Sequence, residues 1–216
     1  MRIGILGAGR IGATAARLFA RAGHEVALSN SRGPASLAGL VEEINREVGA
    51  PRVKAATAGE AATFGEVVLL AVPWRTKDAL PADAAAAVQG KIVIDAMNAY
   101  TAAGGIVDLG NSTSSEELAK RLPGARLVKA FNTIFWEHLA KQGRPDLPLS
   151  KRRAIFLAGD DVEAKRVVSR LIEEIGFAPV DTGTLREGGR SQQPGTPVYN
   201  RNLTQVEATA ILATTH

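Results

Sequence analysis

A short apolar segment at the start of the chain runs directly into a glycine-rich loop, and this arrangement restricts the fold more than any other sequence feature. Residues 2–6 are followed by GAGRIG, a G-x-G-x-x-G sequence, and then by an alanine-rich segment with helical periodicity. A second strand-like segment follows at residues 25–28. The motif alone is a weak signal, but between a strand and a helix it predicts the first βαβ unit of a dinucleotide-binding sheet.

Each glycine of this loop has an expected physical role. Gly7 permits a tight turn, Gly9 leaves room for a pyrophosphate, and Gly12 lets the helix approach the strand. The start of the helix offers free N–H groups to the phosphates. Arg10 is expected either to reach those phosphates or to point into solvent. The cofactor-binding loop is therefore predicted to comprise Gly7, Ala8, Gly9, Arg10, Ile11 and Gly12.

The end of the second strand lacks the acid that NAD-selective sites use to bind the ribose 2′-hydroxyl. The segment reads Ser29-Asn30-Ser31-Arg32, without a carboxylate. The hydroxyl of Ser31 and the guanidinium of Arg32 suit a 2′-phosphate, which an acid would repel. The alternative is that Arg32 is a solvated loop residue. We predict that the cofactor is NADP(H) and that Asn30, Ser31 and Arg32 contact it.

Apolar runs of strand length alternate with amphipathic segments along the chain, which is typical of βαβ units. The pattern predicts an α/β fold of Rossmann type, a doubly wound and mainly parallel sheet with a small C-terminal α/β domain. Expected strands are 2–6, 25–28, 52–55, 67–72, 91–95, 126–129, 154–158 and 178–181. Expected helices are 11–22, 36–47, 58–64, 76–88, 115–121, 162–175 and 203–212.

Two irregular stretches organise the second half of the chain. At residues 142–150, two prolines and a glycine interrupt the periodicity, so we place a domain boundary there. An NADP-binding domain is predicted at 1–148, and a small domain that closes the acceptor cleft at 149–216. Residues 186–202 are expected to form a long functional or partner-facing loop.

Composition excludes several classes of protein. Of the 216 residues, 45% are hydrophobic and 22% charged, which is ordinary for a soluble globular protein. The absence of cysteine excludes disulfides and thiolate metal sites and fits a reducing cytoplasm. The sequence has no signal-peptide pattern and no apolar run of roughly 20 residues. The net charge is only +4, and the basic cluster at residues 151–153 is interpreted as a solvated turn. We expect a cytoplasmic protein with no nucleic-acid, membrane or metal partner.

The carboxyl ends of parallel strands meet at one edge of the sheet, so residues that follow the strands are candidates for the rest of the site. The segment Val72-Pro73-Trp74 follows the fourth strand, and we expect it near the cofactor. The amides of Asn98 and Asn132, with Thr133 beside the latter, suit a nicotinamide carboxamide or a hydride acceptor. Capping of a helix or turn is the alternative role for both amides.

Side chains suited to acid–base catalysis are scarce. The sequence has no Tyr-x-x-x-Lys motif, which argues against a short-chain dehydrogenase. His138 is a candidate for the acceptor side, with surface exposure or packing as the alternative. We therefore assign no catalytic side chain. The lack of an evident proton donor suits direct hydride transfer between two cofactors, in which positioning matters more than acid–base chemistry.

Five segments together resemble the NADPH-dependent coenzyme F420 reductases, also called F420-dependent NADP oxidoreductases. They are RIGILGAGRIG, SRG, AVPW, KAFNT and AGDDVEAKRVVSRLIEEIGFAPVDTGTL, and the resemblance covers most of the chain. It implies a homodimer in which the deazaflavin enters the cleft between the two domains. It also implies 2′-phosphate contacts from Ser31 and Arg32, and a nicotinamide pocket near Val72, Pro73 and the Asn132–Thr133 segment. Hydride would pass directly between nicotinamide and deazaflavin.

Two segments depart from the family pattern. DAMNAY replaces a more apolar segment after the fifth strand, and the 186–202 stretch is longer and more polar. Both segments are candidates for the border of the acceptor site, so two other hypotheses about the function stay open. One is an NADPH-dependent reductase of a flavin, ferric chelate or carbonyl, and another is a nonenzymatic NADPH-sensing module. Only 66 residues follow Ser150, too few for the large helical domain of β-hydroxyacid dehydrogenases or pyrroline-carboxylate reductases.

Overall fold

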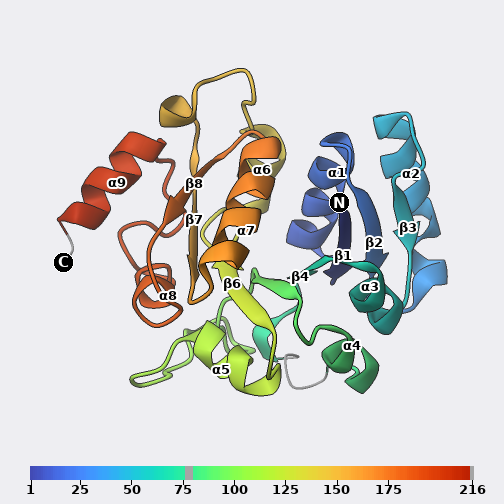
Figure 1. Ribbon diagram of the computed structural model, residues 1–216, viewed down its shortest axis with the longest axis horizontal. Helices are drawn as coiled ribbons and strands as arrows, with labels where there is room; N and C mark the ends of the chain where they lie inside the picture. The colour runs from blue at the N-terminus through green and yellow to red at the C-terminus, as the bar shows by residue number, and fades with distance from the viewer. Residues whose placement is uncertain (76–79, 215–216) are drawn as a thin grey trace.

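A single eight-stranded sheet forms the centre of the molecule in the computed structural model, which describes residues 1–75 and 80–214 (Figure 1). The strand order is β3-β2-β1-β4-β5-β6-β7-β8. Neighbouring strands are parallel except for β6 and β7. The strands are β1 (Arg2–Leu6), β2 (Glu25–Ser29), β3 (Val53–Ala55), β4 (Val67–Leu70), β5 (Ile92–Asp95), β6 (Arg126–Ala130), β7 (Ala154–Gly159) and β8 (Ala178–Asp181). The predicted doubly wound α/β fold is confirmed.

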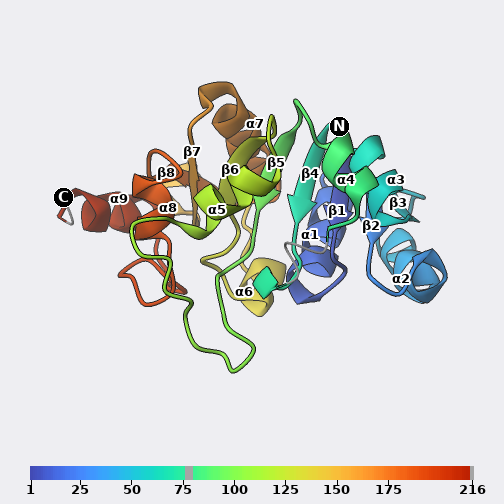
Figure 2. The same cartoon turned by 90° about the horizontal axis from the view of Figure 1, so that it is seen from below.

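Helices cover both faces of the sheet (Figures 1 and 2). On one face, α1, α2, α6 and α7 pack over the central strands, and on the other face α3, α4 and α5 do so. The short α8 and the terminal α9 lie near β7 and β8. The bounds are α1 (Arg10–Arg21), α2 (Ala38–Val48), α3 (Ala58–Phe64), α4 (Ala82–Ala87), α5 (Ser114–Arg121), α6 (Trp136–Lys141), α7 (Val162–Glu174), α8 (Glu187–Ser191) and α9 (Gln205–Ala213). In the described part of the chain, no helix combines the length and apolarity needed to cross a membrane.

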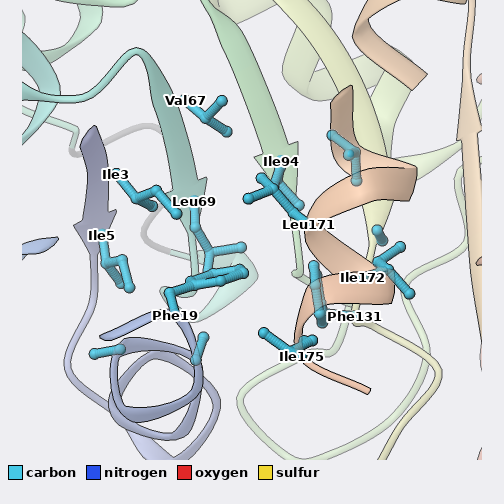
Figure 3. Packing of buried hydrophobic residues seen from close by; sticks show 14 of the residues in the cluster. Ile3, Ile5, Phe19, Val67, Leu69, Ile94, Phe131, Leu171, Ile172 and Ile175 are labelled. Atoms are coloured by element: carbon cyan, nitrogen blue, oxygen red, sulfur yellow. The ribbon is translucent and has the colours of Figure 1, made fainter. Parts of the chain in front are cut away.

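The core on the α1 and α7 face holds the second half of α1 against the sheet. Figure 3 shows side chains of β1, β4 and β5 meeting those of α1 and α7. Phe19 of α1 packs edge to face on Phe131, with ring centroids 6.2 Å apart. Phe131 has a backbone φ of 66°, in the left-handed region that non-glycine residues rarely adopt. Its buried ring fixes this turn, from which Asn132 and Thr133 follow.

A buried ion pair joins the ends of β5 and β6. The ammonium of Lys129 lies 3.2 Å from Oδ2 of Asp95, and both side chains are almost fully buried. Lys129 also donates to the carbonyl of Met97 and to Oγ of Ser114, each at 2.9 Å. Asp95 accepts from Oγ of Ser115 at 2.6 Å and from the backbone N–H of Met97. Two strands, the loop after β5 and the start of α5 are therefore held by one buried charge pair.

The sequence pattern did not predict two short helices, α6 and α8. The stretch 186–202, predicted to be a loop, contains α8, and α6 follows the KAFNT segment. Intrinsic propensity is weak in α8 because two of its residues are glycines. The helix is set by packing instead, since a Cβ at Gly188 would lie 2.4 Å from Oγ1 of Thr182. The helix predicted at 76–88 is observed only as α4, and residues 76–79 lie outside the described residues.

The sheet continues across the predicted domain boundary. β7 pairs with β6, and the 148/149 boundary falls in the connection between α6 and β7. His24, before β2, is bonded through Nε2 to Oε2 of Glu174 at 2.9 Å, which ties the α1–β2 turn to the end of α7. Burial lowers the pKa of His24, and the carboxylate of Glu174 opposes that shift. A 149–216 unit that closes over an acceptor stays a prediction.

The basic cluster at residues 151–153 is only in part the solvated turn that we expected, because Lys151 is exposed but the two arginines are bonded to other parts of the chain. Arg152 donates to the backbone carbonyls of Pro145, Leu147 and Glu173. Arg153 is buried and donates to the side chain of Gln142 and to the carbonyl of Arg201. Both guanidiniums stabilise loops by satisfying backbone carbonyls that are otherwise costly to bury.

The Lys129–Asp95 pair yields a stability prediction. Lys129→Met should lower the free energy of unfolding by roughly 3–5 kcal/mol, because Asp95 is left as an uncompensated buried charge. The double variant Asp95→Asn/Lys129→Met should lose much less, since no unpaired charge stays buried. Urea unfolding followed by circular dichroism measures both values. Equal losses in the single and double variants would contradict the ion-pair account.

Candidate active site

A cavity of about 740 Å³ opens at the carboxyl ends of β1, β2 and β4, within the size range of small-molecule pockets. The chain runs outward from β1 to β3 and then crosses to β4, so the cavity lies at the switch point where open α/β sheets bind ligands. It is lined by residues 6–9, 29–33, 57–58, 71–73, 75 and 80–81.

The glycine loop has the geometry expected of a phosphate-binding turn. Gly7 has a φ of 107°, and a Cβ there would lie 2.4 Å from the carbonyl oxygen of Ala71. A Cβ at Gly12 would lie 1.8 Å from the carbonyl oxygen of Gly7, so these two positions need glycine for close packing. A Cβ at Gly9 would meet no atom within 4 Å, which leaves open space in front of the loop.

The amino end of α1 is free to bind an anion. Gly9 is its N-cap and supplies no side-chain hydrogen bond, and the first turn carries no acid. The first N–H groups of a helix have no partner within the helix, and its dipole favours negative charge there. Of the predicted loop residues, Gly7, Ala8 and Gly9 line the cavity, whereas Arg10, Ile11 and Gly12 do not. The guanidinium of Arg10 lies over the ring of Trp136, 5.4 Å from its centroid.

The loop after β2 presents Ser31 and Arg32 to the cavity. Both residues are exposed and line it. Asn30 shapes the loop, because its Oδ1 accepts from the backbone N–H of Arg32 at 3.0 Å and its Nδ2 donates to Oγ of Ser36 at 2.9 Å. The Arg32 guanidinium makes no hydrogen bond or ion pair within residues 1–75 and 80–214. The described cavity lining contains no Asp or Glu.

The segment after β4 divides between the cavity and the core. Val72 and Pro73 line the cavity as expected, but Trp74 is buried in the apolar cluster beneath the sheet and is not a lining residue. Arg75 lines the cavity and was missed in the sequence. Its position directly after the AVPW segment was the available signal. Arg32 and Arg75 give the cavity two positive charges.

A hydrogen-bond network forms where the chain leaves β5 and β6, and its predicted members Asn98, Asn132 and Thr133 are not among the described lining residues of the cavity. Leu70, Asp95 and Lys129 are register partners in β4, β5 and β6. Asn98 and Asn132 are each three residues beyond that register, so both leave the sheet at the same edge. The amide of Asn98 donates to the carbonyl of Asn132 at 2.9 Å, and the amide of Asn132 donates to Oδ1 of Asn98 at 3.2 Å. The structure brings these two predicted residues together.

Two tyrosines missed in the sequence complete the network. The amide of Asn98 also donates to the hydroxyl of Tyr199 at 3.2 Å, and that hydroxyl lies 3.0 Å from the hydroxyl of Tyr100. Tyr100 belongs to the DAMNAY segment and Tyr199 to the 186–202 stretch, the two segments that we expected at the border of the acceptor site. That expectation was the available signal.

Buried polar atoms next to this network lack partners. In the described part of the chain, Oδ1 of Asn132 and Oγ1 of Thr133 make no hydrogen bond, although both residues are at least nine-tenths buried. Leaving a buried polar group unpaired costs roughly 1–3 kcal/mol, so such atoms call for a physical explanation. Nδ1 of His138 is also buried and unpaired, and its ring packs edge to face on Phe135. No cluster of three or more metal-ligating His, Asp or Glu side chains occurs among the described residues.

Comparison with known proteins gives the family. The family model for coenzyme F420-dependent NADP oxidoreductases matches residues 2–99. The F420-dependent NADP reductase of Methanothermobacter marburgensis is 32% identical in an alignment of length 215. The alignment covers 94% of this chain and 93% of that protein. The chain belongs to the coenzyme F420-dependent NADP oxidoreductase family.

Two further proteins are similar to this chain, one in sequence and one in structure. The metalloreductase STEAP3 of Rattus norvegicus is 30% identical over 185 residues, or 85% of this chain, but the match spans only 34% of STEAP3. The crystal structure of the hypothetical protein SMa0349 from Sinorhizobium meliloti is 37% identical. It superimposes with a TM-score of 0.79 over 94% of this chain and 95% of that one. The family and the fold therefore extend beyond the glycine loop to nearly the whole chain.

Proposed function

We propose that this protein transfers a hydride between NADP(H) and the deazaflavin coenzyme F420. The observation that carries the cofactor assignment is the described lining of the cavity, which has two arginines and no carboxylate. Arg32 and Ser31 stand where a dinucleotide places its adenosine ribose, after the second strand. A guanidinium there would bind a 2′-phosphate through charge-assisted hydrogen bonds, and a hydroxyl would add a further donor.

The other phosphates fit the glycine loop. The free N–H groups at the start of α1 would bind the pyrophosphate, and the space in front of Gly9 would admit it. Arg75 is a second cation at the same cavity. NADPH supplies the hydride when bound, and the chain supplies its position.

The nicotinamide end is assigned to the edge where β4, β5 and β6 finish. A carboxamide carries both an N–H donor and a C=O acceptor. Among the described residues, Oδ1 of Asn132 has no donor and the Thr133 hydroxyl no partner, so the two would match both halves of such a group if the site opened to admit it. Val72 and Pro73 form the apolar wall beside this edge. The pairing accounts for two otherwise unsatisfied buried atoms.

The acceptor is assigned by similarity along the chain. The relative named an F420-dependent NADP reductase matches at nearly full length on both sides, whereas the match to STEAP3 covers a third of that protein. A second candidate, reduction of a ferric chelate or flavin, is favoured by the 30% identity to the metalloreductase. We further expect a homodimer in the cytoplasm.

Replacing Arg32 tests the cofactor assignment. Arg32→Ala should raise the KM for NADPH by roughly ten- to a hundredfold, the cost of about 1.5–3 kcal/mol for hydrogen bonds to a charged group. The KM for NADH should change less than about twofold, since NADH has no 2′-phosphate. Arg46→Ala, at an exposed site on α2, is the matched control. Equal changes for both cofactors would contradict NADP selectivity.

An absorbance assay tests the acceptor. NADPH mixed with oxidised coenzyme F420 and the protein should bleach the deazaflavin absorbance within seconds at micromolar enzyme. The same assay with ferric citrate or FMN should be much slower. Tight NADPH binding without bleaching of F420, together with rapid reduction of one of the other two, would replace the deazaflavin with that acceptor.

A further inference from the structure

The two segments expected to border the acceptor site meet at a pair of tyrosine hydroxyls. Tyr100 comes from the loop after β5 and Tyr199 from the segment between α8 and α9, 99 residues later. Both segments extend toward the lower edge of Figure 2. The hydroxyls lie 3.0 Å apart, and both residues are half-buried.

The network places the pair beside the proposed nicotinamide position. The Tyr199 hydroxyl accepts from the amide of Asn98, and the same amide donates to the carbonyl of Asn132. The pair is therefore one hydrogen bond from the end of β5 and two from the end of β6. The end of β5 lies beside β4, and the residues after β4, Ala71 and Val72, line the cavity; the end of β6 lies beside β5.

The two tyrosine hydroxyls have one more O–H donor than the hydrogen bond between them uses. Each phenol has one proton and can accept two hydrogen bonds. One proton forms the bond between the two phenols, and the amide of Asn98 supplies another donor to Tyr199. Whichever phenol donates within the pair, the other keeps its O–H for a further partner. Burial raises the pKa of Tyr199, so its hydroxyl keeps its proton across the physiological range.

We propose that the Tyr100–Tyr199 pair donates a hydrogen bond to a carbonyl oxygen of the hydride acceptor. This inference rests on the proposed function and restricts the acceptor to molecules whose hydride-accepting atom is conjugated to a carbonyl, as C5 of a deazaflavin and N5 of a flavin are to the pyrimidinedione. A bare ferric ion offers no such oxygen.

The chemistry explains why a neutral donor is useful here. In the proposed step, the C4–H bond of the dihydronicotinamide would break and its hydride, with both electrons, would bond to C5 of a deazaflavin or N5 of a flavin. NADPH becomes NADP⁺, and the electron pair displaced in the acceptor moves onto its conjugated carbonyl. A proton from water then completes the two-electron reduction. A preorganised O–H stabilises charge that develops on the oxygen as the hydride arrives.

The test uses the double variant Tyr100→Phe/Tyr199→Phe, which keeps both rings and removes both hydroxyls. With F420 or FMN as acceptor, kcat should fall at least about tenfold, because one hydrogen-bond donor to a developing oxyanion is worth up to roughly 10²–10³ in rate. The Kd for NADPH should stay within about twofold, since the pair does not line the dinucleotide cavity. The single variant Tyr199→Phe keeps one phenol and should fall between wild type and the double variant.

The controls separate the possible failures. A folded double variant with unchanged kcat would overturn the tyrosine proposal while leaving the proposed function intact. A higher KM for the acceptor, a lower Tm and an unchanged kcat would show a merely structural role and also overturn it. A wild-type protein that binds NADPH but reduces neither F420 nor FMN would contradict both proposals.

Discussion

The buried pair of Lys129 and Asp95 is the interaction on which the arrangement of the site depends. It fixes the ends of β5 and β6 together with the start of α5, and from those ends the chain continues to Asn98 and Asn132. A buried charge pair is stable only if its remaining donors and acceptors are satisfied, and Met97, Ser114 and Ser115 satisfy them here. The buried pair and its hydrogen bonds therefore hold in place the strand ends from which Asn98 and Asn132 follow.

The dinucleotide end of the cavity depends on close backbone contact instead. Gly7 and Gly12 bring β1, β4 and α1 so near one another that a Cβ at either position would overlap a carbonyl oxygen. This contact aims the free N–H groups of α1 at the cavity, while Ser31 and Arg32 stand at its rim. Packing on one side and charge on the other thus define a site that fits a phosphorylated dinucleotide.

The sequence pattern predicted those elements whose structure is determined by residues close to one another along the chain. The first βαβ unit follows from the glycine motif, and the doubly wound sheet from the alternation of apolar and amphipathic segments. The structure differs where distant segments decide the outcome. Trp74 was expected near the cofactor, but its side chain lies in the core, and the tyrosine pair joins residues 99 positions apart. Helix α8 was missed because close packing of its glycines, rather than propensity, forms it.

We propose above all that Ser31 and Arg32, at the edge of the cavity, bind the 2′-phosphate of the cofactor. Calorimetric titration of the wild-type protein with 2′-phospho-ADP-ribose and with ADP-ribose isolates this contribution, because the two ligands differ only in that phosphate. Charge-assisted hydrogen bonds predict binding at least about tenfold tighter for the phosphorylated ligand, with the difference decreasing as salt is added. Equal affinity for the two ligands would contradict the account.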